Sequence, residues 1–198
     1  MTFSSTMANQ LYQIKISLLD FSPTIWRTVL VPSNMSLGDF HMVIQIAMGW
    51  ENGHLHQFMS GRTFYVEDED PDFGTFGKIT TINYSQEKTT LMDVLPKAKS
   101  KLKYEYDFGD GWEHELLLEK VLPFDENTTV PVCLDGKMAC PPEDCGGVWG
   151  YGNMLEILKN PAHEEYEETL EWIGEEFDPE EFDKAEPNAT FEYFRKSK

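Results

Sequence analysis

The chain has 198 residues, of which 40% are hydrophobic and 13% aromatic, and its formal net charge is −19. This composition is sufficient for a packed core, and no apolar run approaches the roughly 18 residues that span a membrane. The three Arg residues form no basic stripe, so direct nucleic-acid binding is not expected. With three Cys residues and no secretory signal at the N-terminus, we expect a cytoplasmic protein without a disulfide framework.

The N-terminal part predicts two strands followed by a helix. Polar and apolar residues alternate over residues 12–18, which is typical of a half-buried strand, and β-forming residues fill 25–31. Ser36 suits the N-cap of a helix over residues 37–48, and Gly49 suits the position after its end. The two strands should form a hairpin, with the helix after it.

Shorter elements are expected in the middle of the chain. Residues 54–59 and 62–66 read as strands, residues 67–88 as a long loop, and residues 90–95 as one helical turn. The order strand, strand, helix, strand, strand is that of a β-grasp-like opening. We therefore expect an α+β fold with a mostly antiparallel or mixed sheet.

The segment Tyr104–His114, Y-E-Y-D-F-G-D-G-W-E-H, predicts a β-hairpin, because Asp-Gly stands between two alternating runs. Asp107, Asp110 and His114 would then crowd one end of the hairpin. Two carboxylates and an imidazole suit a divalent metal ion or general acid–base chemistry. The structural alternative is that Asp110 serves the turn, Asp107 caps a backbone donor and His114 packs within its strand.

A second segment, residues 132–151, contains all three cysteines. Cys133, Cys140 and Cys145 would form a Cys₃His zinc set if His114 lay beside them, although their spacing is wider than that of most zinc sites. The alternative is that they are ordinary reduced cysteines in a loop.

The end of this segment, P-P-E-D-C-G-G-V-W-G-Y, is typical of a rigid binding loop, because prolines stiffen the backbone and glycines permit close approach. We expect it to pack against the hairpin. The candidate catalytic residues of the two segments are Asp107, Asp110, His114, Glu143 and Asp144, and the candidate binding residues are Tyr104, Tyr106, Trp112, Pro141, Pro142, Gly146, Gly147 and Tyr151.

Other histidines and the tryptophans have simpler interpretations. His54 and His56 are two residues apart in a predicted strand, and such a pair can bind a metal but more often packs and forms hydrogen bonds. The tryptophans are expected in the core or at its edge: Trp26, Trp50, Trp112, Trp149 and Trp172.

The C-terminal third is predicted to be helical and is strongly acidic. Helices are expected over residues 153–158, 162–177 and 178–184. Between Glu143 and Glu186 there are 15 Asp and Glu residues against two Lys residues, a net charge of −13. Such a surface repels phosphate backbones but can bind a basic partner protein. No linker divides the chain, so we expect one domain over residues 10–196 and a loose N-terminus over residues 1–9.

The hairpin motif and the loop motif P-P-E-D-x-G-G-x-x-G-Y together resemble the plasmid pRiA4b ORF-3-like family. Three shorter motifs agree: I-W-R at Ile25, W-x-x-x-H at Trp50 and F-D-P-E-x-F-D at Phe177. The resemblance covers residues 11–194 and implies an association with plasmids and mobile elements, without an established activity or cofactor. A resolvase-like label attached to some members does not fit a chain with three scattered Arg residues.

Two functional hypotheses follow. The first is a binding module for a basic partner protein, since the sequence contains no complete catalytic set. The second is a hydrolase of the phosphoester class that uses a divalent metal ion, held by carboxylates and His114 of the hairpin and the loop.

Overall fold

The computed structural model describes residues 10–67, 82–125, 127–174 and 177–196. The expected loose N-terminus over residues 1–9, and most of the expected loop over residues 67–88, fall outside this part of the chain.

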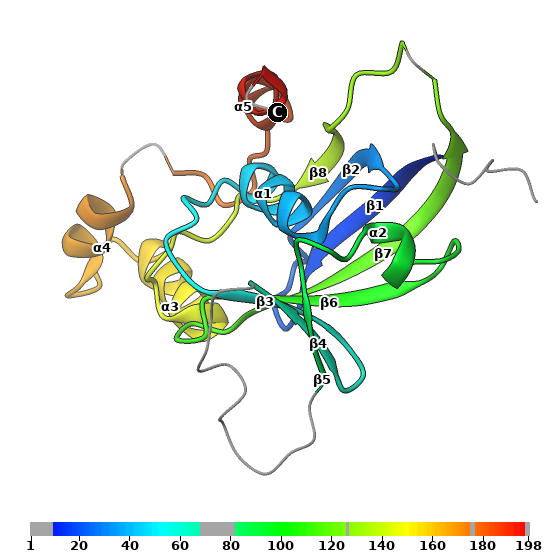
Figure 1. The fold of residues 1–198 in the computed structure, drawn as a ribbon. Helices are drawn as coiled ribbons and strands as arrows, with labels where there is room; N and C mark the ends of the chain where they lie inside the picture. Colours follow the sequence, from blue (N-terminus) through cyan, green and yellow to red (C-terminus); the bar gives the residue numbers. More distant parts are fainter. Residues whose placement is uncertain (1–9, 68–81, 126, 175–176, 197–198) are drawn as a thin grey trace, which may run out of the picture.

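The described residues form a mixed sheet of eight strands in the order β5-β4-β3-β6-β7-β1-β2-β8 (Figure 1). Neighbouring strands are antiparallel, except that β4 and β5 run parallel. The predicted α+β class and mostly antiparallel sheet are thus confirmed, while the narrower β-grasp-like assignment stays a prediction. The strands are β1 (Gln10–Leu18), β2 (Trp26–Pro32), β3 (His56–Ser60), β4 (Thr63–Val66), β5 (Ile82–Ser85), β6 (Lys101–Tyr106), β7 (Trp112–Pro123) and β8 (Val132–Lys137).

The helices form two groups around this sheet (Figure 1). Helices α1 and α5 contact each other, and they also contact β2 and β8 respectively, whereas α3 and α4 pack together elsewhere. No described helix combines the length and the apolar character that crossing a lipid bilayer requires. The helices are α1 (Leu37–Met48), α2 (Leu91–Val94), α3 (Gly147–Leu158), α4 (Tyr166–Ile173) and α5 (Ala185–Lys196).

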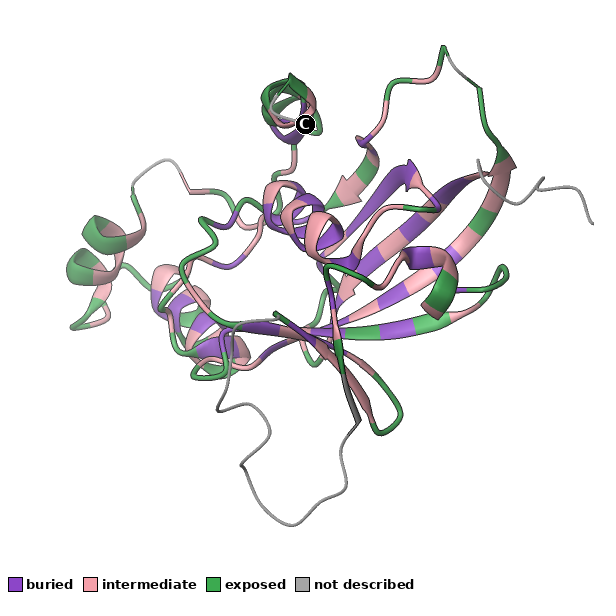
Figure 2. Cartoon of the chain, in the orientation of Figure 1, coloured by how far each residue is buried: buried purple, intermediate pink, exposed green. Residues whose placement is uncertain are grey.

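The core lies between α1 and the central strands, which carry most of the buried residues in Figure 2. The alternation that predicted β1 is confirmed, because Ile14 and Ile16 are fully buried while the residues between them are partly exposed. Phe40 and Ile44 of α1 are buried in the same core. Each such side chain contributes on the order of 1.5–3 kcal/mol by leaving water, so this contact fixes α1 on the sheet.

Both predicted ends of α1 are confirmed. The backbone N–H of Asp39 donates to Ser36 Oγ over 3.0 Å, which satisfies one of the free donors at the helix start. Gly49 adopts the left-handed conformation, with φ of 97°, and its N–H donates to the Gln45 carbonyl. The chain therefore leaves α1 abruptly and enters the segment that carries Trp50 and His54.

The predicted hairpin is confirmed as β6 and β7. Tyr104 pairs with His114 and Tyr106 with Trp112 in antiparallel register. All four side chains are buried, so this face of the hairpin belongs to the core. Asp107 follows β6 with a left-handed φ of 55° and begins the turn.

Two predictions in the middle of the chain are wrong at their boundaries. Residues 82–85, expected within a loop, form β5, because they pair in parallel with β4. Helix α3 begins at Gly147 and not near residue 153. Its first two turns contain three glycines, which have low helix propensity, so the sequence pattern hides the helix start.

The C-terminal helices also differ from the prediction. Helix α4 covers Tyr166–Ile173 and has no buried residue, so the expected buried stripe is wrong. Residues 178–184 form turns instead of a helix, and the longer helix α5 follows them. Trp149 of α3 and Trp172 of α4 are 89% and 53% exposed, which contradicts their expected place in the core.

Candidate functional site

The β6–β7 turn packs against the loop that precedes α3, as expected from the sequence. The N–H of Gly146 donates to Asp110 Oδ2 over 3.1 Å, and Gly147 lies against the Asp110 backbone carbonyl. At the other end of the loop, Trp50 Nε1 donates to the Pro141 carbonyl over 3.0 Å. The two sequence motifs therefore form one continuous structural feature.

His54 joins this feature through the end of the β3–β6 ladder. His56 pairs with Tyr106 in the ladder, and the N–H of Asp107 then donates to the Leu55 carbonyl over 2.9 Å. The residues just beyond the two strand ends, His54 and Asp107, are consequently side by side, although they are far apart in the sequence.

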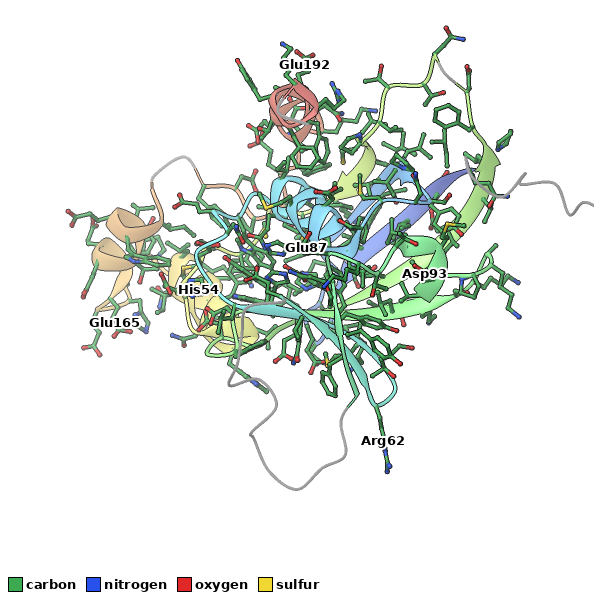
Figure 3. All side chains as sticks on the ribbon, in the orientation of Figure 1. His54, Arg62, Glu87, Asp93, Glu165 and Glu192 are labelled. Carbon is green, nitrogen blue, oxygen red and sulfur yellow. The ribbon has the colours of Figure 1, made fainter. Side chains whose placement is uncertain are left out.

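His54, Asp107 and Asp144 form a cluster that can hold a cation, and we call it the His54 cluster. His54 Nδ1 lies 3.6 Å from Asp107 Oδ2, and its Nε2 lies 3.4 Å from Asp144 Oδ1. One ligand atom from each residue can be chosen so that all three lie within 4.8 Å of one another. Figure 3 labels His54 beside α3, the helix that follows Asp144 in the chain. Two carboxylates to one imidazole make the cluster attractive to a divalent cation.

The geometry of the His54 cluster fits a metal ion after a small adjustment. Ligand atoms bound at about 2.1 Å lie at most about 4.2 Å from one another, and the three atoms already lie within 4.8 Å, so a small closure of the side chains is sufficient. Each ring nitrogen of His54 faces a different carboxylate, so one of the side chains must also turn. Asp144 is free to do so, since its side chain is 75% exposed.

The Asp107 carboxylate is fixed by a hydrogen bond to Oδ1, the oxygen that does not face His54. Asp107 Oδ1 accepts the N–H of Gly109 over 2.9 Å within the turn, which leaves Oδ2 directed to His54. Both Asp107 and Asp144 have a left-handed φ, 55° and 60°, which costs a non-glycine residue on the order of 1 kcal/mol or more. The surrounding hydrogen bonds stabilise the backbone at Asp107 and Asp144 and so fix the positions from which the two side chains extend.

Tyr106 and Glu143 hold the segment that presents His54. The Tyr106 hydroxyl accepts the N–H of Gly53 over 3.0 Å and donates to Glu143 Oε1 over 2.6 Å. The same carboxylate oxygen accepts the N–H of Glu51 over 3.1 Å. Burial, and then the nearby Glu143, raise the pKa of Tyr106, so its hydroxyl stays a proton donor. The residues before His54 and before Asp144 are thereby tied together.

A buried polar network supports the same segment from inside. His41 Nε2 lies 2.6 Å from Asn52 Oδ1, and the N–H of Asn52 donates to Gln45 Oε1 over 2.9 Å. His41 Nδ1 lies 2.8 Å from the Tyr104 hydroxyl. Because Asn52 Oδ1 can only accept, His41 carries its proton on Nε2 and receives the tyrosine proton on Nδ1. Burial, and then His56, lower the pKa of His41 to about 3, so the ring is neutral.

His56 belongs to this network and not to the His54 cluster. Its ring stacks on His41 with centroids 3.4 Å apart, and its Nε2 lies 2.9 Å from Gln86 Oε1. Burial lowers the pKa of His56 to about 4. His54 and His56 therefore do not form a metal-binding pair.

The other candidate catalytic residues lie around the His54 cluster. Asp110 accepts the N–H of Gly146, and Glu143 accepts from Tyr106, so both carboxylates hold the site together. His114 is fully buried, its Nδ1 donates to the Trp112 carbonyl over 3.0 Å, and burial lowers its pKa to about 4. A neutral imidazole with no access to solvent is a structural brace, so His114 is not brought to the cluster.

The remaining candidate binding residues are spread over the core and the loop. Tyr104, Trp112 and Tyr151 are buried, and Tyr151 packs against Phe21 with ring centroids 4.9 Å apart. The loop residues differ in exposure: Pro141 and Gly147 are buried, Pro142 is half-buried, and Gly146 is exposed.

The structure does not assemble the Cys₃His set. In the described part of the chain, the ligand atoms of Cys133, Cys140, Cys145 and His114 do not come within 4.8 Å of one another as a set. All three cysteines carry free thiols. Burial raises the pKa of each thiol, to about 12 for Cys145, so none is a thiolate at neutral pH.

His54 is not among the site residues predicted from the sequence, although its motif W-x-x-x-H is part of the family resemblance. Its position depends on the pairing of β3 with β6, which no local pattern encodes. The fold and the site together define an α+β protein with a candidate cation site where a β-hairpin, a loop and the segment before β3 meet.

Comparison with known proteins places the chain in a family. Residues 10–186 match the family model of the plasmid pRiA4b ORF-3-like proteins, so the chain belongs to this family. It is 38% identical over 169 residues to the uncharacterized protein y4hQ of Sinorhizobium fredii (strain NBRC 101917 / NGR234), covering 85% of this chain and 83% of that protein. The crystal structure of MM3350 from Methanosarcina mazei Go1, a protein of unknown function, is similar with a TM-score of 0.79 and 40% identity, covering 89% of this chain and 97% of that chain.

Proposed function

We propose that the protein is a hydrolase that uses a divalent metal ion bound by His54, Asp107 and Asp144. The observation that carries this proposal is the convergence of one imidazole and two carboxylates from three separate segments, with ligand atoms within 4.8 Å of one another. Three protein ligands leave coordination positions for water and substrate, as catalytic metal sites require.

A divalent ion held by His54, Asp107 and Asp144 would lower the pKa of a coordinated water and so supply hydroxide at neutral pH. Glu143 is our candidate for the base that takes the proton. Its Oε1 is fixed by Tyr106 and by the N–H of Glu51, and the residue directly precedes Asp144 in the chain. This hydroxide would add to the electrophilic carbon or phosphorus, and the proton that Glu143 took from the water would pass to the leaving group.

The phosphoester subclass is the less favoured form of this proposal. Among the described residues, no Lys or Arg lines the adjoining cavity that includes Asp144. Phosphoryl transfer depends on cations around the transferred group, and the described residues lining this cavity supply none besides the proposed metal ion.

Metal titration tests the proposal directly. The purified protein is stripped with chelator and titrated with Zn²⁺, Mn²⁺ and Mg²⁺ by calorimetry, alongside Asp107→Asn and Asp144→Asn. We expect one ion per chain, with weaker binding in both variants, and hydrolysis of a substrate in a general panel only when the ion is present. A folded protein that takes up none of the three ions would refute the proposal.

A non-catalytic binding module remains the second candidate. Trp149 is 89% exposed on α3, and it lines a cavity with Asp20 and Glu156. An exposed indole beside carboxylates suits a basic partner protein, whose cations can interact with both. Capture of a defined basic partner that is lost in Trp149→Ala, together with no metal uptake, would support this candidate over the hydrolase.

A further inference from the structure

A cavity of about 370 Å³ lies between α3 and α4, and the candidate metal ligand Asp144 forms part of its wall. We call this cavity the α3–α4 groove. Because Asp144 belongs both to the groove and to the His54 cluster, a molecule bound in the groove lies next to the proposed metal ion.

The wall of the groove has two chemical parts. Met154, Ile157 and Trp172 supply apolar surface, and the indole of Trp172 is 53% exposed. Glu165 and Glu168 supply negative charge, and neither forms an ion pair with a described residue. An aliphatic chain that ends in a cation matches this arrangement, since its methylenes pack on the apolar part while its head meets the carboxylates and the indole.

The groove is not suited to other occupants. Its charged side chains are all acidic, so it repels phosphate and carboxylate ligands. The groove therefore supplies binding, and the chemistry stays at the His54 cluster.

We propose that the α3–α4 groove binds a Lys or Arg side chain of a peptide substrate and so presents a bond of that peptide to the metal site. This inference rests on the proposed hydrolase function. Hydrolysis of a peptide bond adds one water, with the hydroxide joining the carbonyl carbon and a proton joining the released amine.

Peptide binding can be measured separately from metal binding. A fluorescein-labelled pentapeptide with one central Lys among alanines is titrated with the full chain at low ionic strength and followed by anisotropy. The same peptide with Gln or Glu in place of Lys is the ligand control. We expect the Lys peptide alone to bind, and to weaken as salt is added, because its cation interacts with exposed carboxylates.

Variants of the groove test where the peptide binds. Trp172→Ala should weaken binding about two- to fivefold through loss of the cation–π contact. Glu165→Gln combined with Glu168→Gln should weaken it about two- to tenfold, as expected for two exposed ion pairs. Tyr193→Ala and Glu192→Gln, on α5, remove an exposed aromatic and an exposed carboxylate outside the groove and should change nothing.

The outcomes separate the two proposals. Three results would overturn the groove inference while leaving metal uptake intact. They are equal binding of the Lys and Gln peptides, unchanged peptide binding in the groove variants, and binding of free spermidine without the peptide. Peptide binding in a protein that takes up no metal would refute the hydrolase, and with it the substrate role of the peptide.

Discussion

Gly147 packs against the backbone carbonyl of Asp110 so closely that a Cβ at position 147 would overlap the carbonyl oxygen. Its φ of 68° is in addition a conformation that other residues rarely adopt. This contact joins the β6–β7 turn to the start of α3, and through them it sets the separation of Asp107 and Asp144.

Gly147→Ala is expected to destabilise the protein by at least about 1 kcal/mol and to weaken metal binding, because the turn and the loop must move apart. Gly152→Ala is the matched control in the same helix, where a new Cβ meets nothing within 4 Å. Since Ala is favoured over Gly inside a helix by about 1 kcal/mol, Gly152→Ala should stabilise the protein. Chemical denaturation measures both effects, and equal stability of the two variants would contradict the role of this contact.

Removing a ligand of the His54 cluster should abolish the stabilisation that the metal ion provides. At a metal concentration 100 times the dissociation constant, binding adds about 2.7 kcal/mol, which corresponds to a rise in Tm of roughly 5–10 °C for a chain of this size. We expect His54→Ala and Asp144→Asn to show no such rise in a thermal scan with added Zn²⁺ or Mn²⁺. His163→Ala, which removes a histidine outside the cluster, should keep the full rise.

The fold could largely be predicted because local patterns specify it. Alternation specified β1, Ser36 and Gly49 specified the ends of α1, and Asp-Gly specified the β6–β7 hairpin. Each of these signals acts over a few residues, so the sequence alone carries them.

The candidate site could be predicted only in part, because its assembly is non-local. The loop and the turn were identified by their motifs, but His54 reaches Asp107 only through the pairing of β3 with β6. At the start of helix α3, Gly146 and Gly147 have the positive φ that glycine readily adopts, and Gly147 lies against the distant Asp110 carbonyl. His114 follows the structural alternative, in which it packs within its strand: it shares the alternating face of Leu116 and Leu118, and its ring is fully buried.

Tyr106→Phe should both destabilise the protein and loosen the His54 cluster. The substitution removes the hydroxyl that accepts the N–H of Gly53 and donates to Glu143. Leaving such partners without a hydrogen bond costs about 1–3 kcal/mol. Because these two residues precede His54 and Asp144, metal affinity measured by calorimetry should fall as well. Tyr193→Phe, at an exposed position on α5, should alter neither property.

Arg27 links three parts of the fold, and Arg27→Lys should therefore be strongly destabilising. Its side chain is 2% exposed, with Nε donating to the Ala47 carbonyl at the end of α1 and Nη1 donating to the Lys137 carbonyl of β8. Its guanidinium also lies 3.8 Å from the ring centre of Phe182. A lysine keeps the charge but cannot donate to both carbonyls as the planar guanidinium does. We therefore expect the free energy of unfolding, measured by chemical denaturation, to fall by about 3 kcal/mol. Phe182→Leu, which removes only the stacking, should cost about 1 kcal/mol.

Acid should unfold the protein through its buried histidines. The pKa values are lowered to about 3 for His41, about 4 for His56 and about 4 for His114, in each case mainly by burial. In the unfolded chain the same groups titrate near pH 6.5, so below that pH the unfolded state binds protons that the folded state does not. The stabilising contribution is complete above pH 6.5 and is lost as the pH falls toward the folded-state values. Each histidine accounts for at most about 1.4 kcal/mol per pH unit in this window, and for less near its two ends.

His114→Leu isolates one of these contributions. Chemical denaturation from pH 6.5 to 5, where most carboxylates stay ionised, should give a slope of unfolding free energy against pH that is lower by about 1 kcal/mol per unit in the variant. The leucine has a similar volume, and it removes the buried Nε2, which has no hydrogen-bond partner among the described residues. Because His114 is a brace and not a ligand, the variant should also keep its metal affinity. An unchanged slope would mean that His114 is protonated in the folded protein, and a loss of metal affinity without loss of stability would return His114 to the candidate ligands.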